Sequence, residues 1–157
     1  MNGATHPPAC AAAPYLPHEA DAVLLEDLRA IDAHVTRATA TVRAPSPFSD
    51  ADGGWPAWLI VELMAQTVAA GVGLREFQPG VRPRLGLLLG VRDFACAVDR
   101  FAPGTRLAFE VTESTRDERG MGVFDCVLEV GAAQVAKATL SVYLPPDVDE
   151  YLRSIES

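Results

Sequence analysis

The chain has 157 residues, 49% of them hydrophobic, and a formal net charge of −8 at pH 7. This length predicts one domain with enough apolar side chains for a core, and the acidic balance argues against nonspecific binding to nucleic acid or to an anionic membrane. Three scattered cysteines, Cys10, Cys96 and Cys126, match neither a metal-ligand spacing nor a disulfide framework, which predicts a reducing, cytoplasmic location.

The first elements along the chain are a tail, two extended segments and a loop. Residues 1–14 are rich in Ala and Pro and lack the basic and apolar regions of a signal peptide, so they are expected to form a disordered tail. Extended segments follow at 22–31 and 34–44, and the second alternates and is rich in β-branched residues, as in a half-buried strand. Residues 45–54 contain P-S-P and D-G-G and are expected to form a loop.

The stretch 55–73, W-P-A-W-L-I-V-E-L-M-A-Q-T-V-A-A-G-V-G, predicts a long apolar helix with a single acid, Glu62. Pro56 suits the first turn of that helix, where a missing N–H costs nothing, and the helix is expected to end between residues 73 and 80. Polar side chains interrupt the apolar run, so no membrane insertion is expected. A lone carboxylate in or beside a core is usually paired or chemically active, which makes Glu62 the first candidate for chemistry.

After the helix the hydrophobic period changes to two. Strands are expected at 85–94, 107–111, 124–130 and 136–144, and their spacing predicts an antiparallel meander. The segment 145–157 is expected to be an acidic tail, with a short helix as one option. A helix that is apolar on all sides has to be covered, so we expect one α+β domain over 15–144. Its curved antiparallel sheet would wrap around the helix, an architecture called the hotdog fold.

Three motifs resemble the hotdog 3-hydroxyacyl-(acyl carrier protein) dehydratases: L-P-H at 16–18, L-L-E-D at 24–27 and P-A-W-L-I-V-E-L-M-A-Q at 56–66. The family reads roughly L-P-H-R in the first segment and runs from P-G to E-A-M-A-Q along the helix, and the resemblance covers 15–144. The runs P-A-W, E-L-M-A-Q-T-V and G-V-F-D-C-V are most similar to the dehydratase subgroup of aryl polyene biosynthesis clusters.

This resemblance implies a reaction, a partner and a cofactor requirement. The reaction is elimination of water from a 3-hydroxyacyl thioester, in a fatty-acid-like or aryl polyene pathway. The partner is an acyl carrier protein, whose phosphopantetheine arm holds the substrate, so no cofactor of the chain's own is expected. No metal or nucleotide is expected either, since the sequence contains no ligand cluster and no phosphate-binding loop.

The resemblance also assigns roles along the helix. Glu62 matches the acid that assists departure of the hydroxyl, and the N–H of Ala57, where the family usually has glycine, would stabilise the thioester carbonyl with help from the helix dipole. Gln66 lies one helical turn from Glu62 on the same face and could orient it. Trp58 is a candidate for lining an acyl tunnel, although packing is the commoner role of a large residue at a helix start.

The stretch 75–106 is basic, with six arginines against three acids, in an otherwise acidic chain. Such a stretch is either a solvated surface or a dock for an acidic partner or a phosphate. Its candidate residues for binding the carrier protein are Arg82, Arg84 and Arg92.

The chain departs from the family at the catalytic histidine, which the family carries in G-H-F-P fourteen residues before the acid. Here that position is Phe48, and no histidine follows His34. In a first reading, His18 or a loop acid, Asp50 or Asp52, replaces the missing base. Each also has an ordinary structural role, because D-G is a common turn pair and a histidine near a strand often only caps it.

Two further readings stay open. Hotdog dehydratase sites form at a dimer interface, with the histidine from one chain and the acid from the other. The chain could therefore be half of a heterodimer, donating Glu62 or only stabilising its partner. In the third reading it is a hotdog thioesterase or acyl-binding protein, several of which use one helix carboxylate. A dimer is expected in any case, because the fold leaves a sheet edge and a helix flank uncovered. His6 and His34 are expected to face solvent, and Cys126 to lie in the core.

Overall fold

The computed structural model describes residues 8–18 and 20–156. Its strands are β1 (Cys10–Ala11), β2 (Asp27–Ala30), β3 (Val35–Thr41), β4 (Trp55–Pro56), β5 (Leu87–Cys96), β6 (Arg100–Phe101), β7 (Arg106–Arg116), β8 (Met121–Val130) and β9 (Ala133–Tyr143). Its helices are α1 (Leu59–Arg75) and α2 (Val148–Glu156), and two short 3-10 helices, η1 (Ala13–Tyr15) and η2 (Ala20–Ala22), precede β2.

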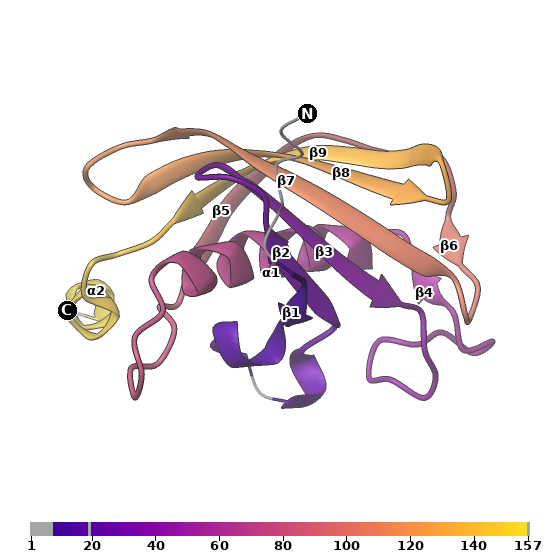
Figure 1. The fold of residues 1–157 in the computed structure, drawn as a ribbon, viewed down its shortest axis with the longest axis horizontal. Coiled ribbons are helices and arrows are strands. Elements are labelled where there is room, and N and C mark those ends of the chain that lie inside the picture. Colours follow the sequence, from indigo (N-terminus) through magenta and orange to yellow (C-terminus); the bar gives the residue numbers. More distant parts are fainter. Residues whose placement is uncertain (1–7, 19, 157) are drawn as a thin grey trace.

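In the part of the chain that is described, the strands form one large antiparallel sheet and one small pair. The large sheet has the order β1-β2-β3-β7-β8-β9-β5, and β4 pairs only with β6. The large sheet curves over α1, which lies along its concave side (Figure 1). The predicted meander is β7-β8-β9, and the predicted arrangement of a curved sheet around one long helix is confirmed.

The core lies between α1 and the sheet. Side chains alternate along a strand, so each long strand turns one apolar face to the helix. On β7 and β8 these side chains are Leu107, Phe109, Val111, Phe124, Cys126 and Leu128, and all are buried. Burial raises the pKa of the Cys126 thiol to about 12, so the prediction of a core side chain at this position is confirmed. The helix buries side chains on more than one face, among them Leu59, Ile60, Leu63 and Met64.

The helix begins later than predicted, and the placement of Pro56 in its first turn was wrong. Trp55 and Pro56 instead form β4, which pairs with β6. Two turn residues then lead into Leu59, the first residue of α1. The error has a physical cause, because pairing with a strand far along the chain overrides the local preference of Pro for a helix start.

The prediction of a disordered N-terminal tail was wrong for residues 8–14. Cys10 and Ala11 pair with Leu28 and Asp27 of β2, and Ala12 is completely buried. The pairing satisfies backbone groups at the edge of β2, and the small Ala12 side chain fits against the core. The rest of the predicted tail, with His6, lies outside the described residues. At the other end, the segment predicted as an acidic tail contains α2.

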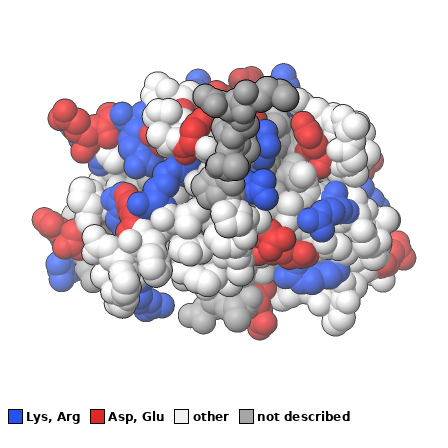
Figure 2. All heavy atoms as spheres, viewed as in Figure 1, with Lys and Arg blue, Asp and Glu red and all other residues white. Residues whose placement is uncertain are grey.

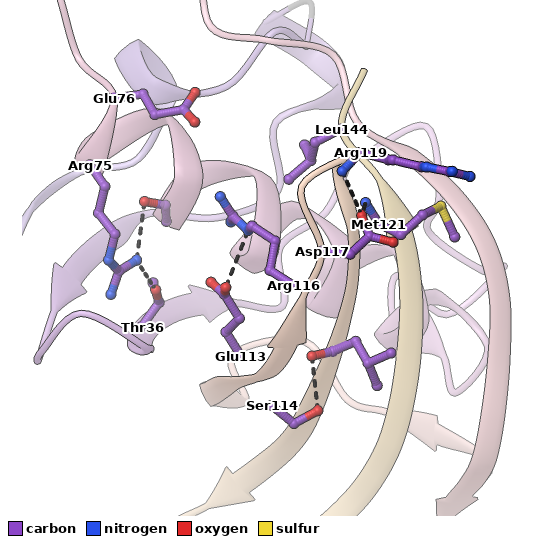
Figure 3. A network of polar contacts seen from close by, with 12 residues as sticks. Thr36, Arg75, Glu76, Glu113, Ser114, Arg116, Asp117, Arg119, Met121 and Leu144 are labelled. Atoms are coloured by element: carbon purple, nitrogen blue, oxygen red, sulfur yellow. Dashed lines mark hydrogen bonds and ion pairs between the residues drawn. The ribbon is translucent and has the colours of Figure 1, made fainter. Parts of the chain in front are cut away.

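Arg75 ties the C-terminal end of α1 to the sheet (Figure 3). Its guanidinium donates to Thr36 Oγ1 at 2.7 Å and to the Gly71 carbonyl at 3.1 Å. It also donates to the carbonyl of Asp32 at 2.7 Å, in the turn between β2 and β3, and to that of Val35, the first residue of β3, at 2.8 Å. A cation at this end of a helix is also favoured by the helix dipole.

We expect Arg75→Met to lower the free energy of unfolding by about 1–3 kcal/mol, because an apolar side chain of similar length leaves four acceptors without their charged donor. Denaturant unfolding followed by circular dichroism measures the change. The matched control is Arg119→Met, since the exposed Arg119 side chain has no partner within the described residues. Its expected effect is below about 0.5 kcal/mol, and an equal loss in both variants would contradict the role assigned to Arg75.

Candidate active site

Two titratable side chains that are distant in the sequence meet beside the helix. Glu62 lies in the first turn of α1, and His18 lies between η1 and η2. The Nε2 atom of His18 is 3.7 Å from Oε1 of Glu62. The Glu62 side chain is 43% exposed, so the lone acid of the helix lies beside the core and not within it. Packing of the N-terminal segment against α1 brings the two together.

Gln66 holds this arrangement in place. Its Nε2 donates to Glu62 Oε1 at 3.3 Å and to the Ala22 carbonyl at 2.6 Å, and its Oε1 accepts from the Leu24 N–H at 3.0 Å. Gln66 is buried, and its bond to the Leu24 N–H is buried as well, while its bonds to Glu62 and Ala22 are partly buried. The expected position of Gln66 on the same helical face as Glu62 is therefore observed, and its amide also fastens the N-terminal segment to α1.

We expect Gln66→Leu to lower the free energy of unfolding by about 1–3 kcal/mol, because a buried N–H at Leu24 and a carbonyl at Ala22 lose their partner. Thermal or urea unfolding measures this loss. Gln134→Leu is the control, since Gln134 is exposed on β9 and its replacement is expected to change stability by less than about 0.5 kcal/mol. An unchanged midpoint for Gln66→Leu would show that these hydrogen bonds do not stabilise the fold.

Glu62 and His18 line a cavity of about 120 Å³. Its remaining walls come from the N-terminal segment, α1, the start of β5 and the end of β9. They are formed by Pro17, Ala65, Val68, Ala69, Leu85, Gly86, Leu88, Val142 and Leu144. A cavity with two adjacent polar groups and otherwise apolar walls suits a substrate with a reacting polar head and a hydrocarbon chain.

The loop 45–54 does not contribute to this cavity. Asp50 organises the loop: its carboxylate pairs with Arg100 at 2.9 Å and accepts from the backbone N–H groups of Asp52 and Gly54. The Arg100 guanidinium and these N–H groups hold the pKa of Asp50 below its usual range. Asp52 occupies the turn next to it, so the structure does not bring either acid to Glu62 within one chain. Phe48, at the position of the family's histidine, packs against the core.

The predicted carbonyl donor is occupied. The N–H of Ala57, which was predicted to stabilise the thioester carbonyl, donates instead to the carbonyl of Asp99, just before β6, at 2.9 Å. The next two N–H groups, of Trp58 and Leu59, have no hydrogen-bond partner among residues 8–18 and 20–156. The Trp58 side chain is 63% exposed and does not line the cavity of Glu62, contrary to the predicted tunnel role.

The three predicted carrier-binding arginines differ in their contacts. Arg84 pairs with the Glu76 carboxylate and donates to the carbonyls of Leu144 and Pro145, so its role is structural. Arg82 and the β5 residue Arg92 are exposed, and neither side chain has a partner within the described part of the chain. On the face drawn in Figure 2, basic and acidic side chains are interspersed and form no single basic field.

Most of the cavity walls were not predicted from the sequence. Ala65 and Ala69 follow Glu62 by three and seven residues, and helical spacing was the signal that could have placed them on its face. No pattern in the sequence indicated that Gly86 would lie in the cavity wall. In the described residues, no group of three or more His, Cys, Asp and Glu side chains could hold a metal ion. None of the described helices is long and apolar enough to span a membrane.

Comparison with known proteins gives one family and several related folds. A family model described as ApeP-like, ApeP dehydratase, matches residues 10–153. The chain is similar to the dehydratase heterocomplex ApeI:P from Xenorhabdus doucetiae, with a TM-score of 0.84 and 29% identity over 94% of this chain and 99% of that chain. No curated protein matches the chain.

Two more distant structures share the fold. One is Cj0977, a sigma28-regulated virulence protein from Campylobacter jejuni, with a TM-score of 0.64 and 13% identity over 87% of this chain and 96% of that chain. The other is a hypothetical thioesterase with coenzyme A from Streptococcus pneumoniae TIGR4, with a TM-score of 0.56 and 14% identity over 74% of this chain and 86% of that chain. At these identities the likeness shows the fold alone.

Proposed function

We propose, from the premise that this chain belongs to the ApeP dehydratase family, that it removes water from 3-hydroxyacyl groups carried as thioesters on an acyl carrier protein. The predicted resemblance to hotdog dehydratases of the aryl polyene type is confirmed by that family match and by the ApeI:P heterocomplex. The observation that carries the proposal is the distance of 3.7 Å between His18 Nε2 and Glu62 Oε1, in a cavity with otherwise apolar walls.

The pair supplies both proton transfers of the elimination. Neutral His18 accepts the proton from C2 of the acyl group at Nε2, and the electrons of that C–H bond form the C2=C3 double bond. Protonated Glu62 donates its proton to the hydroxyl at C3, which leaves as water. The proton on His18 then returns to Glu62 across the short gap, which restores both groups. Positioned acid–base groups of this kind contribute about 10²–10⁴-fold to a rate.

The thioester carbonyl needs a donor while the proton at C2 is removed. The open N–H groups of Trp58 and Leu59 are suited to this role, since they lie at the positive end of the α1 dipole. They precede Glu62 by four and three residues, which places them one turn away on the same side of the helix. We therefore assign to them the role predicted for Ala57.

We propose a second hotdog chain as the partner, either a copy of this chain or a related dehydratase. The strand β5 forms one edge of the large sheet and exposes Leu88, Leu89, Val91 and Phe94. An exposed apolar edge strand is normally covered in a native protein. Leu88 also lines the cavity, so pairing along β5 would cover the edge and close the cavity at the same time.

The position of Phe48 favours a second candidate function. At the position that corresponds to the histidine of the hotdog 3-hydroxyacyl-(acyl carrier protein) dehydratases, this chain has a side chain without acid–base chemistry. The second candidate is a heterodimer in which a partner chain supplies the histidine, and this chain either contributes Glu62 or stabilises its partner without reacting.

In both candidate functions, Arg82 and Arg92 would receive the acidic carrier protein or the phosphate of its arm. The reaction would take place in the cytoplasm and needs no cofactor beyond that arm.

The test is dehydration of a 3-hydroxyacyl carrier protein by the purified chain, alone and coexpressed with a histidine-bearing hotdog dehydratase. Mass spectrometry of the phosphopantetheine arm detects the loss of one water. Turnover by the chain alone supports the pair of Glu62 and His18, and turnover only with the second chain supports the heterodimer. Release of free acid, or no turnover in either setting, refutes the proposal.

A further inference from the structure

Gly86 lies immediately before β5, in the wall of the cavity that contains Glu62 and His18. A Cβ atom at this position would lie 3.0 Å from Leu144 Cδ2 and 3.5 Å from Val142 Cγ1. Leu144 and Val142 line the same cavity. An added methyl group at residue 86 would therefore crowd these two side chains, and Leu144 would have to shift within the cavity wall.

Backbone conformation does not require a glycine here. The glycines with a positive φ among the described residues are Gly53, Gly80, Gly104, Gly120 and Gly131, and Gly86 is not one of them. A side chain at residue 86 would therefore meet no left-handed strain. Its cost would come from the space it takes beside Val142 and Leu144.

The reacting end and the apolar end of the cavity are separated along α1. Glu62 and Ala69 both line the cavity and are seven residues apart, which along a helix is about 10 Å. The polar groups lie at the Glu62 end. The Ala side chains at 65 and 69 keep the helix side of the cavity open beyond Glu62, and Gly86 does the same on the sheet side.

We infer that Gly86 is a specificity-determining residue: its missing side chain admits acyl chains that extend beyond the reacting carbons, and a larger residue there restricts the site to short chains. This inference rests on the proposed function, since it assigns the apolar part of the cavity to the acyl group. Each methylene that a pocket accepts or rejects changes kcat/KM by roughly 10–200-fold, so one added methyl group has a measurable effect.

The test compares Gly86→Ala with the parent on 3-hydroxybutyryl and 3-hydroxydecanoyl carrier protein, with both proteins in the same oligomeric state. We expect kcat/KM for the decanoyl substrate to fall by roughly 10–200-fold, with the butyryl substrate nearly unchanged. Ala69→Val fills the same cavity from α1 and is expected to reproduce the effect if Gly86→Ala folds poorly. The control is Ala132→Val, because Ala132 is exposed in the turn between β8 and β9 and belongs neither to the cavity wall nor to β5.

A binding measurement separates this inference from the proposed function. Unreactive decanoyl- and butyryl-pantetheine amides are titrated against the parent and each variant by calorimetry. Selective loss of decanoyl binding in Gly86→Ala and Ala69→Val supports the inference even if no variant dehydrates a substrate. Equal loss for both chain lengths, or no loss for either, overturns it, while dehydration by the parent would leave the proposed function standing.

Discussion

Glu62→Gln is expected to lower the rate of dehydration by about 10²–10⁴-fold, because the amide cannot give a proton to the departing hydroxyl. The replacement keeps the size of the side chain, and its amide oxygen can still accept from Gln66. Since the Glu62 side chain is only partly buried, we expect the free energy of unfolding to change by less than about 1 kcal/mol. Single-turnover measurement of the enoyl product, with saturating enzyme, gives the rate without interference from product release.

The matched control is Glu129→Gln, which removes one carboxylate from an exposed position on β8. It is expected to turn over like the parent, so that a fall in rate cannot be attributed to net charge. Full activity of Glu62→Gln, with the chain alone and with a histidine-bearing partner, would remove Glu62 from the mechanism. If the chain alone is inactive, full activity of Glu62→Gln beside the partner would leave this chain only the role of a stabilising subunit.

His18→Gln is expected to lower the same rate by about 10²–10⁴-fold, since glutamine keeps a donor near Glu62 but cannot accept the proton from C2. The control is His34→Gln, because His34 is exposed in the turn before β3 and its backbone N–H, not its ring, bonds to Asp32.

The comparison of these two variants identifies the chain that supplies the base. If both lose activity, the pair of His18 and Glu62 is the reacting unit. If His18→Gln is fully active beside a histidine-bearing chain while Glu62→Gln is not, the base comes from the partner. Full activity of His18→Gln in the isolated chain would eliminate His18 as the base.

The parts of the fold that follow a local period were predicted from the sequence. Alternation of apolar and polar residues placed the three strands of the meander, and the apolar run placed α1, because each pattern reports a local geometry. The small pair of β4 and β6 was missed, and with it the true start of the helix. Its two short strands gain their stability from each other across the loop and helix between them, which no local pattern records.

In the candidate site, too, some contacts follow from the local sequence and others depend on how distant segments pack together. The contact between Gln66 and Glu62 follows from helical spacing and was predicted. The approach of His18 to Glu62 depends on how the N-terminal segment packs against α1, so the sequence could offer His18 only as one of several bases. Ala57 was a reasonable donor by position, but the Asp99 carbonyl takes its N–H. That bond forms only when the segment before β6 has folded back beside the helix start.

The walls of the cavity come from opposite ends of the chain, Pro17 and His18 from one and Val142 and Leu144 from the other. Because a protein is synthesised from its N-terminus, β9 leaves the ribosome after the other described strands. β9 also lies between β8 and β5 in the large sheet, so β5 has no neighbour within the described sheet until β9 has been made. A nascent chain stalled before β9 would hold Glu62, His18 and the apolar wall from α1, but not the wall formed by Val142 and Leu144. The cavity is therefore closed only after β9 has been made.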